Sequence, residues 1–113
     1  MIKLVDVYPD GRAMNIAEGI LRARFHQGLD KPQLLEPNRP YLFDVDMRAT
    51  ANVFLPGHRI RVDVTSSNFP QFDRNPNTGE ALGASDRVRV ARQTVFHAAG
   101  KASHILLPVV AAP

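Results

Sequence analysis

The sequence contains no cysteine and no tryptophan, and its cations are eleven arginines against three lysines. Without cysteine, the chain has no disulfide scaffold, no thiolate nucleophile and no zinc–cysteine site. Arginine suits fixed pairing with carboxylates and stacking on aromatic rings, so we interpret many arginines as structural. The formal net charge is +3, but eleven carboxylates are interspersed with the cations and no two Lys or Arg residues are adjacent. This pattern disfavours a basic nucleic-acid surface, and we expect no nucleic-acid partner.

Long hydrophobic runs are also missing. No apolar stretch approaches the roughly 18 residues of a membrane span, so we expect no membrane partner. The first residues, MIKLVDVYPDG, lack the apolar region and small-residue cleavage site of a signal peptide. Together with the absence of cysteine, this favours a cytoplasmic location.

What the chain does contain is typical of a single all-β domain over residues 1–113. The hydrophobic content is 44%, and nine prolines and seven glycines separate short apolar runs. The clearest strand follows the turn sequence Pro56-Gly57, where Ile60, Val62 and Val64 alternate with polar residues. About six strands are predicted, which suggests a sandwich of the jelly-roll or Greek-key kind. The predicted strands are residues 2–8, 19–26, 41–48, 59–65, 88–97 and 103–110, and residues 12–17 are expected to be irregular or one helical turn.

The stretch 52–79 organises the rest of the chain. Its last part, residues 66–79, carries two prolines, three asparagines and a glycine, so it is expected to be a loop. Phe69 and Phe72 lie within this loop and would be costly to leave in water. We therefore expect the loop to be held against a surface.

Few residues point to chemistry, and we assign no catalytic, cofactor-binding or metal-binding residue. The nearest approach to a nucleophile elbow, residues 83–87 around Ser85, lacks the second glycine and a following helix. No two histidines have an obvious metal-pair spacing, although His97 and His104 flank a predicted hairpin. The segment 73–79 has spaced oxygen ligands but fails the calcium-loop template, so an Asx turn is the default interpretation.

Six segments together resemble the C-terminal, non-catalytic β-domain of the cocaine esterase and X-prolyl dipeptidyl peptidase group of α/β-hydrolases. They occur in the order of that family over nearly the whole chain, and SSNFP followed by FDRNPNTG is the most specific. The segments are LVDVYPDG (4–11), EGILRAR (18–24), VFLPGHRIRV (53–62), SSNFPQFDRNPNTG (66–79), ARQTV (91–95) and HILLPV (104–109).

The resemblance implies a jelly-roll, galactose-binding-like fold, of which this chain is the C-terminal part. It also implies membership in hydrolases of esters or amides that use a Ser-His-Asp triad. That triad belongs to a separate upstream domain and nothing here matches it, so whether this chain takes part in an enzyme is left open. The expected partner is an α/β-hydrolase catalytic domain, in the same polypeptide or another, or a second copy in a homo-oligomer.

By the same resemblance, the module is expected to contribute to substrate-cleft shape, stability and assembly, and its loop is expected to be a docking surface. A loop folded back on its own sandwich is the competing interpretation. The alternative function is an independent β-sandwich module that binds carbohydrate, a small ligand or another protein. The docking residues are expected to be Asn68, Phe69, Pro70, Phe72, Asp73 and Arg74.

Overall fold

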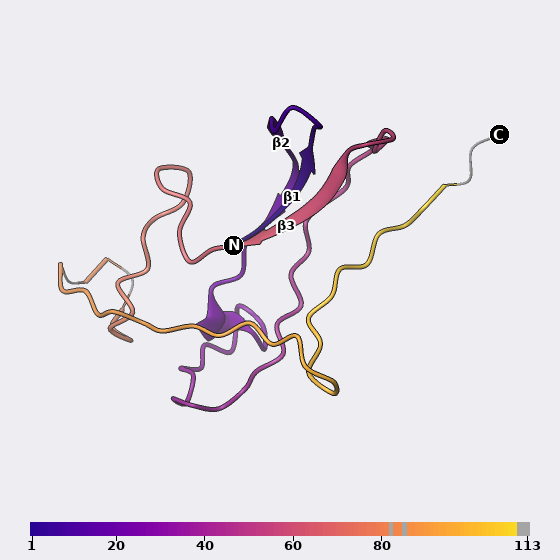
Figure 1. The fold of residues 1–113 in the computed structure, drawn as a ribbon. Coiled ribbons are helices and arrows are strands. Elements are labelled where there is room, and N and C mark those ends of the chain that lie inside the picture. The colour runs from indigo at the N-terminus through magenta and orange to yellow at the C-terminus, as the bar shows by residue number, and fades with distance from the viewer. Residues whose placement is uncertain (82, 85, 111–113) are drawn as a thin grey trace.

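The computed structural model describes residues 1–81, 83–84 and 86–110. In these ranges the chain forms three strands, β1 (Ile2–Val7), β2 (Ala13–Gly19) and β3 (Arg59–Val64), and one short 3-10 helix, η1 (Ala23–Phe25). The strands make one antiparallel sheet in the order β2-β1-β3, with long loops below it (Figure 1). The architecture is therefore all-β, as predicted. Within the same ranges, no helix is long and apolar enough to cross a membrane.

The turn between β1 and β2 follows from its sequence. Gly11 donates its backbone N–H to the carbonyl of Tyr8 at 3.0 Å and has a φ of +90°, which glycine adopts without steric cost. Asp10 accepts hydrogen bonds from the backbone and side chain of Arg12 at 3.0 and 2.7 Å. These bonds lower the pKa of the Asp10 carboxyl from its ordinary value. Aspartate and glycine are residues typical of tight turns, so this turn follows from its local sequence.

β2 was not predicted, because a bulge hides its alternation. Leu4 lies opposite Ala17, but the next residue, Val5, lies opposite Asn15, so Ile16 is the extra residue. The side chains of residues 13–19 therefore do not alternate with a period of two along the whole strand. The prediction of an irregular segment over 12–17 is wrong, because the tight turn brings this segment directly alongside β1.

The turn before β3 also has the predicted geometry. His58 donates its backbone N–H to the carbonyl of Leu55 at 3.0 Å, and Gly57 has a φ of +84°. Proline and glycine thus occupy the two central positions of a type II turn. β3 then runs antiparallel to β1, with Val62 opposite Leu4.

Four predicted strands differ from the structure. Residues 19–26 are not a strand, since they contain the end of β2 and the helix η1. The described residues of 41–48, 88–97 and 103–110 form no strand either. In 41–48 the exposure of the side chains nevertheless alternates: Tyr41, Val45 and Met47 are half-buried, and Phe43 is 41% exposed against 90% for Leu42. The alternation of apolar and polar residues predicts which side chains face the interior of the molecule. A strand also requires a neighbouring strand to pair with.

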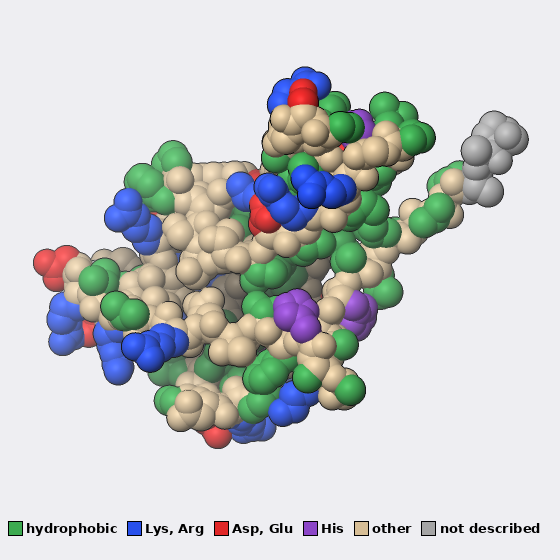
Figure 2. Space-filling model, in the orientation of Figure 1, with side chains coloured by type: hydrophobic (Ala, Val, Ile, Leu, Met, Phe, Trp, Pro, Cys, Tyr) green, Lys and Arg blue, Asp and Glu red, His purple; other side chains and the backbone are tan. Residues whose placement is uncertain are grey.

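The core is small and centred on β1. Among the described residues, the buried apolar side chains are Leu4, Val5 and Val7, and Asp6 is the buried charged one. The accessible surface is 9484 Å², against roughly 6,200 Å² for a compact monomer of this mass. The radius of gyration is 16.7 Å, against about 13 Å for a compact domain of this length. Apolar side chains are spread over the visible surface between charged ones (Figure 2).

Candidate functional site

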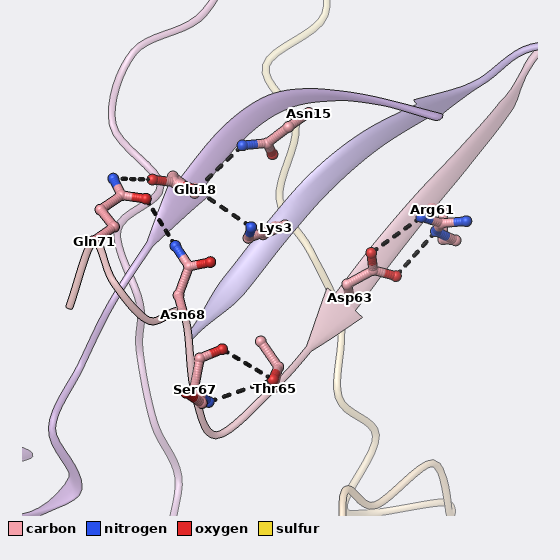
Figure 3. A network of polar contacts seen from close by, with 9 residues as sticks. All are labelled: Lys3, Asn15, Glu18, Arg61, Asp63, Thr65, Ser67, Asn68 and Gln71. Carbon is pink, nitrogen blue, oxygen red and sulfur yellow. Dashed lines mark hydrogen bonds and ion pairs between the residues drawn. The ribbon is translucent and has the colours of Figure 1, made fainter. Parts of the chain in front are cut away.

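The loop after β3 is attached to the sheet through polar side chains. Glu18 of β2 accepts hydrogen bonds from Gln71 at 2.6 Å and Asn15 at 3.1 Å, and pairs with Lys3 at 3.8 Å. Gln71 in turn accepts a hydrogen bond from the Asn68 side chain at 2.8 Å. Figure 3 shows this chain of contacts crossing from β2 and β1 into the loop. The loop is therefore held on its own sheet by its polar residues.

The two aromatic residues of the loop, Phe69 and Phe72, differ in their exposure. Phe69 is 59% exposed, and the Arg74 guanidinium lies 4.8 Å from the centre of its ring. Phe72 is half-buried, and its backbone N–H donates to the carbonyl of Asn68 at 3.1 Å. Pro70, between them, is exposed. The Phe69–Arg74 pair is thus exposed, whereas Gln71 anchors the loop to Glu18.

Asp73 and Arg74 extend this surface into an open pocket of about 300 Å³. Cationic and acidic side chains from distant parts of the chain meet there. Asp73 and Arg74 are exposed, whereas Arg22 is half-buried. The pocket lining is Arg22, Asp73, Arg74, Pro76, Gly83, Asp86, Arg87 and Val88. Of the six predicted docking residues, Asp73 and Arg74 line this pocket, and Arg74 also contacts Phe69.

The other sequence candidates do not assemble a reactive centre. Asn75 accepts the backbone N–H of Asn77 at 3.2 Å, which is the Asx turn expected in place of a calcium loop. Across the part of the chain that the structure describes, no group of three or more His, Asp or Glu residues could hold a metal ion. The peptide N–H of Ser103 donates to the carbonyl of Phe96 at 2.9 Å, so the chain does turn back between His97 and His104. Ser85 lies outside the described residues.

A buried pair of ionisable residues joins β1 to the start of β3. His58 Nδ1 lies 2.9 Å from Asp6 Oδ1, and the two side chains are 8% and 4% exposed. Since a carboxylate only accepts hydrogen bonds, Nδ1 carries the proton. The centres of the His58 and Tyr8 rings lie 4.2 Å apart, and the Arg12 guanidinium lies 4.6 Å from the centre of the same Tyr8 ring. The pair fixes the position of β3 relative to β1.

Sequence reasoning missed two polar contacts, the Gln71–Glu18 hydrogen bond and the His58–Asp6 pair. Gln71 and Glu18 are separated by 53 positions, and no local pattern connects them. Asp6 did carry a signal, because it falls on the face of β1 that also bears Leu4. A carboxylate on such a face needs a partner, and the β1–β3 register places His58 beside it.

Comparison with known proteins identifies the relatives of this chain. The sequence profile of the X-Pro dipeptidyl-peptidase C-terminal non-catalytic domain matches residues 1–106. The chain belongs to this family. It is also similar to the cocaine esterase of Rhodococcus sp. (strain MB1 Bresler), with 46% identity over 110 residues. The predicted family resemblance is thereby confirmed.

The match to the esterase is unequal in extent. It covers 96% of this chain but 19% of the esterase, so the chain spans less than a fifth of the length of that relative. The matched family is described as non-catalytic, which agrees with the failure to find a nucleophile elbow in the sequence.

Proposed function

We propose that this chain is the non-catalytic β-module of a serine hydrolase of esters or peptides, of the acyl esterase or X-Pro dipeptidyl-peptidase type. The module packs against an α/β-hydrolase catalytic domain, in the same polypeptide or in another, and contributes to cleft shape, stability and assembly. Its fold is the C-terminal part of a jelly-roll, galactose-binding-like sandwich. Similarity to the non-catalytic family and to the esterase supports this assignment.

The observation that carries the packing role is the excess of exposed surface. The chain exposes about 3,300 Å² more than a compact monomer of its mass would. A standard protein interface covers about 800 Å² on each partner, so the excess is more than enough for a large interface. Exposed apolar residues account for part of it, with Leu42 90% and Val53 75% exposed. Covering such residues stabilises both partners by roughly 25 cal/mol per Å² of apolar surface.

The docking surface in this proposal is the loop 68–74. The anchors to Glu18 hold the loop before a partner arrives, which reduces the entropy lost on binding. Phe69 supplies apolar area, and Arg74 supplies a cation that can move from the Phe69 ring to a carboxylate of the partner. Exposed aromatic and arginine residues are the types that contribute most to binding energy.

The test uses the relative as its source of a catalytic domain. A Rhodococcus cocaine esterase that lacks the region matched by this chain is titrated with the unchanged chain. The titration is repeated with the Phe69→Ser variant and with the Phe72→Ser variant of the chain. Loss of an interface aromatic costs about 1–2 kcal/mol, so each serine variant is expected to weaken association about tenfold.

Leu29→Ser is the matched control, because Leu29 is more exposed than Phe69 and lies outside the loop. The control is expected to bind like the unchanged chain. Equal binding by the control and both phenylalanine variants would refute the docking role of the loop. A saturable stabilisation of the chain by sugars, without binding to the esterase, would favour the independent binding module instead.

A further inference from the structure

The turn between β1 and β2 contains Asp10-Gly11, which is the only Asp-Gly or Asn-Gly sequence in the chain. Such dipeptides favour isoaspartate formation, because glycine has no side chain to shield its backbone nitrogen. That nitrogen attacks the side-chain carboxyl carbon of the aspartate, one carboxyl oxygen leaves as water, and a five-membered succinimide forms. Water then opens the ring at either carbonyl. One product is aspartate, and the other is isoaspartate, in which the backbone runs through the former side chain.

Packing does not obstruct this reaction in the folded chain. Asp10, Gly11 and Arg12 are all exposed, so water reaches the turn. Apart from the two chain neighbours of Gly11, no heavy atom lies within 4 Å of the position that a Cβ on this residue would take. Protection of the dipeptide must therefore come from hydrogen bonds within the turn.

Hydrogen bonds hold both reacting groups apart. The Gly11 nitrogen, which would attack, donates its N–H to the carbonyl of Tyr8 at 3.0 Å. The Asp10 carboxylate accepts the backbone N–H of Arg12 through Oδ1 at 3.0 Å and the Arg12 side-chain Nε–H through Oδ2 at 2.7 Å. Both oxygens are thus bound to the residue after the attacking nitrogen. The backbone bond and then the side-chain bond lower the pKa of Asp10, and the ionised carboxylate has no hydroxyl group to leave as water.

Arg12 is itself positioned by an aromatic ring. Its guanidinium lies 4.6 Å from the centre of the Tyr8 ring, and the centres of the Tyr8 and His58 rings lie 4.2 Å apart. Exposed ion pairs are weak partly because long side chains lose conformational freedom when they pair. Contact with the Tyr8 ring favours one position of the guanidinium, so the bond to Asp10 is stronger when β1 and the turn before β3 are folded.

We propose that Asp10-Gly11 is a site of isoaspartate formation and that Arg12 protects it in the folded chain. Isoaspartate at this position would lengthen the backbone by one methylene group inside the turn that joins β1 to β2. Val7 pairs with Ala13 at the base of this turn, and Val7 belongs to the small core. The modification is therefore expected to destabilise the sheet.

The test follows isoaspartate formation in the full chain during long incubation in neutral buffer. Isoaspartate is quantified by enzymatic methylation of its free α-carboxyl group and located by peptide mass spectrometry. The chain unfolded in guanidinium chloride is expected to form isoaspartate at position 10 several times faster than the folded chain. Folded Arg12→Ala should also react several times faster than the folded unchanged chain, because it loses the side-chain bond to Asp10.

Arg39→Ala is the matched control. Arg39 is exposed, pairs with Glu36 at 2.7 Å and lies 5.2 Å from the centre of the Tyr41 ring, so this variant removes the same kinds of contact away from the turn. It is expected to form isoaspartate at the unchanged rate. The unchanged chain is also incubated in enough urea to match the stability of Arg12→Ala, and it should still react more slowly than that variant.

Three results would overturn the proposal. Isoaspartate found only at other positions of the unfolded chain would remove Asp10-Gly11 as the site. A folded unchanged chain that reacts as fast as the unfolded chain would show that the turn gives no protection. Equal rates for Arg12→Ala and the unchanged chain at matched stability would show that Arg12 is not the protecting residue.

Discussion

Replacement of His58 by phenylalanine is expected to destabilise the chain strongly. Phenylalanine keeps a ring against Tyr8, which lies 4.2 Å away between ring centres, but removes the proton that His58 donates to Asp6. Asp6 is 3% exposed, so its carboxylate would stay buried without that partner. Removing one member of a buried pair costs about 3–5 kcal/mol. Domains of this kind have about 5–15 kcal/mol in total.

The assay is urea unfolding followed by far-ultraviolet circular dichroism. With a slope of about 1–3 kcal/mol per molar urea, the midpoint should fall by at least about 1 M. The control is the double variant Asp6→Val with His58→Phe, which removes both polar partners and should recover most of the loss. A loss below about 1 kcal/mol for His58→Phe, or a double variant as unstable as the single one, would refute the structural role of the pair.

Three further outcomes are expected. Gly19→Ala should cost about 1–3 kcal/mol in thermal or urea unfolding, because the added methyl would collide with the backbone oxygen of Asp46. Unchanged stability would mean that segment 45–50 does not lie against β2. Glu18→Ala removes the acceptor of the loop anchors, so amide hydrogen exchange should accelerate in residues 66–72 with a stability loss of about 1 kcal/mol; equal exchange would contradict the anchoring. The pKa of Asp10 is lowered first by the backbone N–H of Arg12 and then by its side chain; Arg12→Ala keeps the first bond and removes the second, so the pKa, measured by NMR, should rise partway towards its ordinary value. The carboxylate's contribution to stability is present above the ordinary pKa of aspartate and is lost as the pH falls through the lowered value. An unshifted pKa in the variant would show that the side chain of Arg12 does not contribute to the lowering.

The parts of the fold that sequence predicted correctly are those determined locally. Pro56-Gly57 specifies its turn through the φ preferences of two residues, and the alternation after it specifies β3. The turn at Gly11 follows for the same reason. Each of these features depends on residues within a few positions of one another.

Features that depend on distant partners were not predictable in this way. The 41–48 segment shows alternating exposure of its side chains but has no neighbouring strand, and β2 was hidden by the bulge at Ile16. For the candidate site, that the loop is held against a surface followed from the hydrophobicity of Phe69 and Phe72, although the contacts that hold it are polar and leave Phe69 59% exposed. The identity of the anchor, Glu18, did not, because a long polar side chain can reach a partner anywhere on the folded surface.

The measurement that tests the central proposal most directly is a titration of truncated Rhodococcus cocaine esterase with this chain. The truncated esterase lacks the region that the chain matches, and binding is followed by its thermal unfolding and esterase activity. Saturable binding that raises the unfolding temperature, and is weakened by Phe69→Ser but not by Leu29→Ser, is the predicted result. No binding, with unfolding of the truncated esterase unchanged at every concentration, would contradict the assignment of the chain as a hydrolase-packing module.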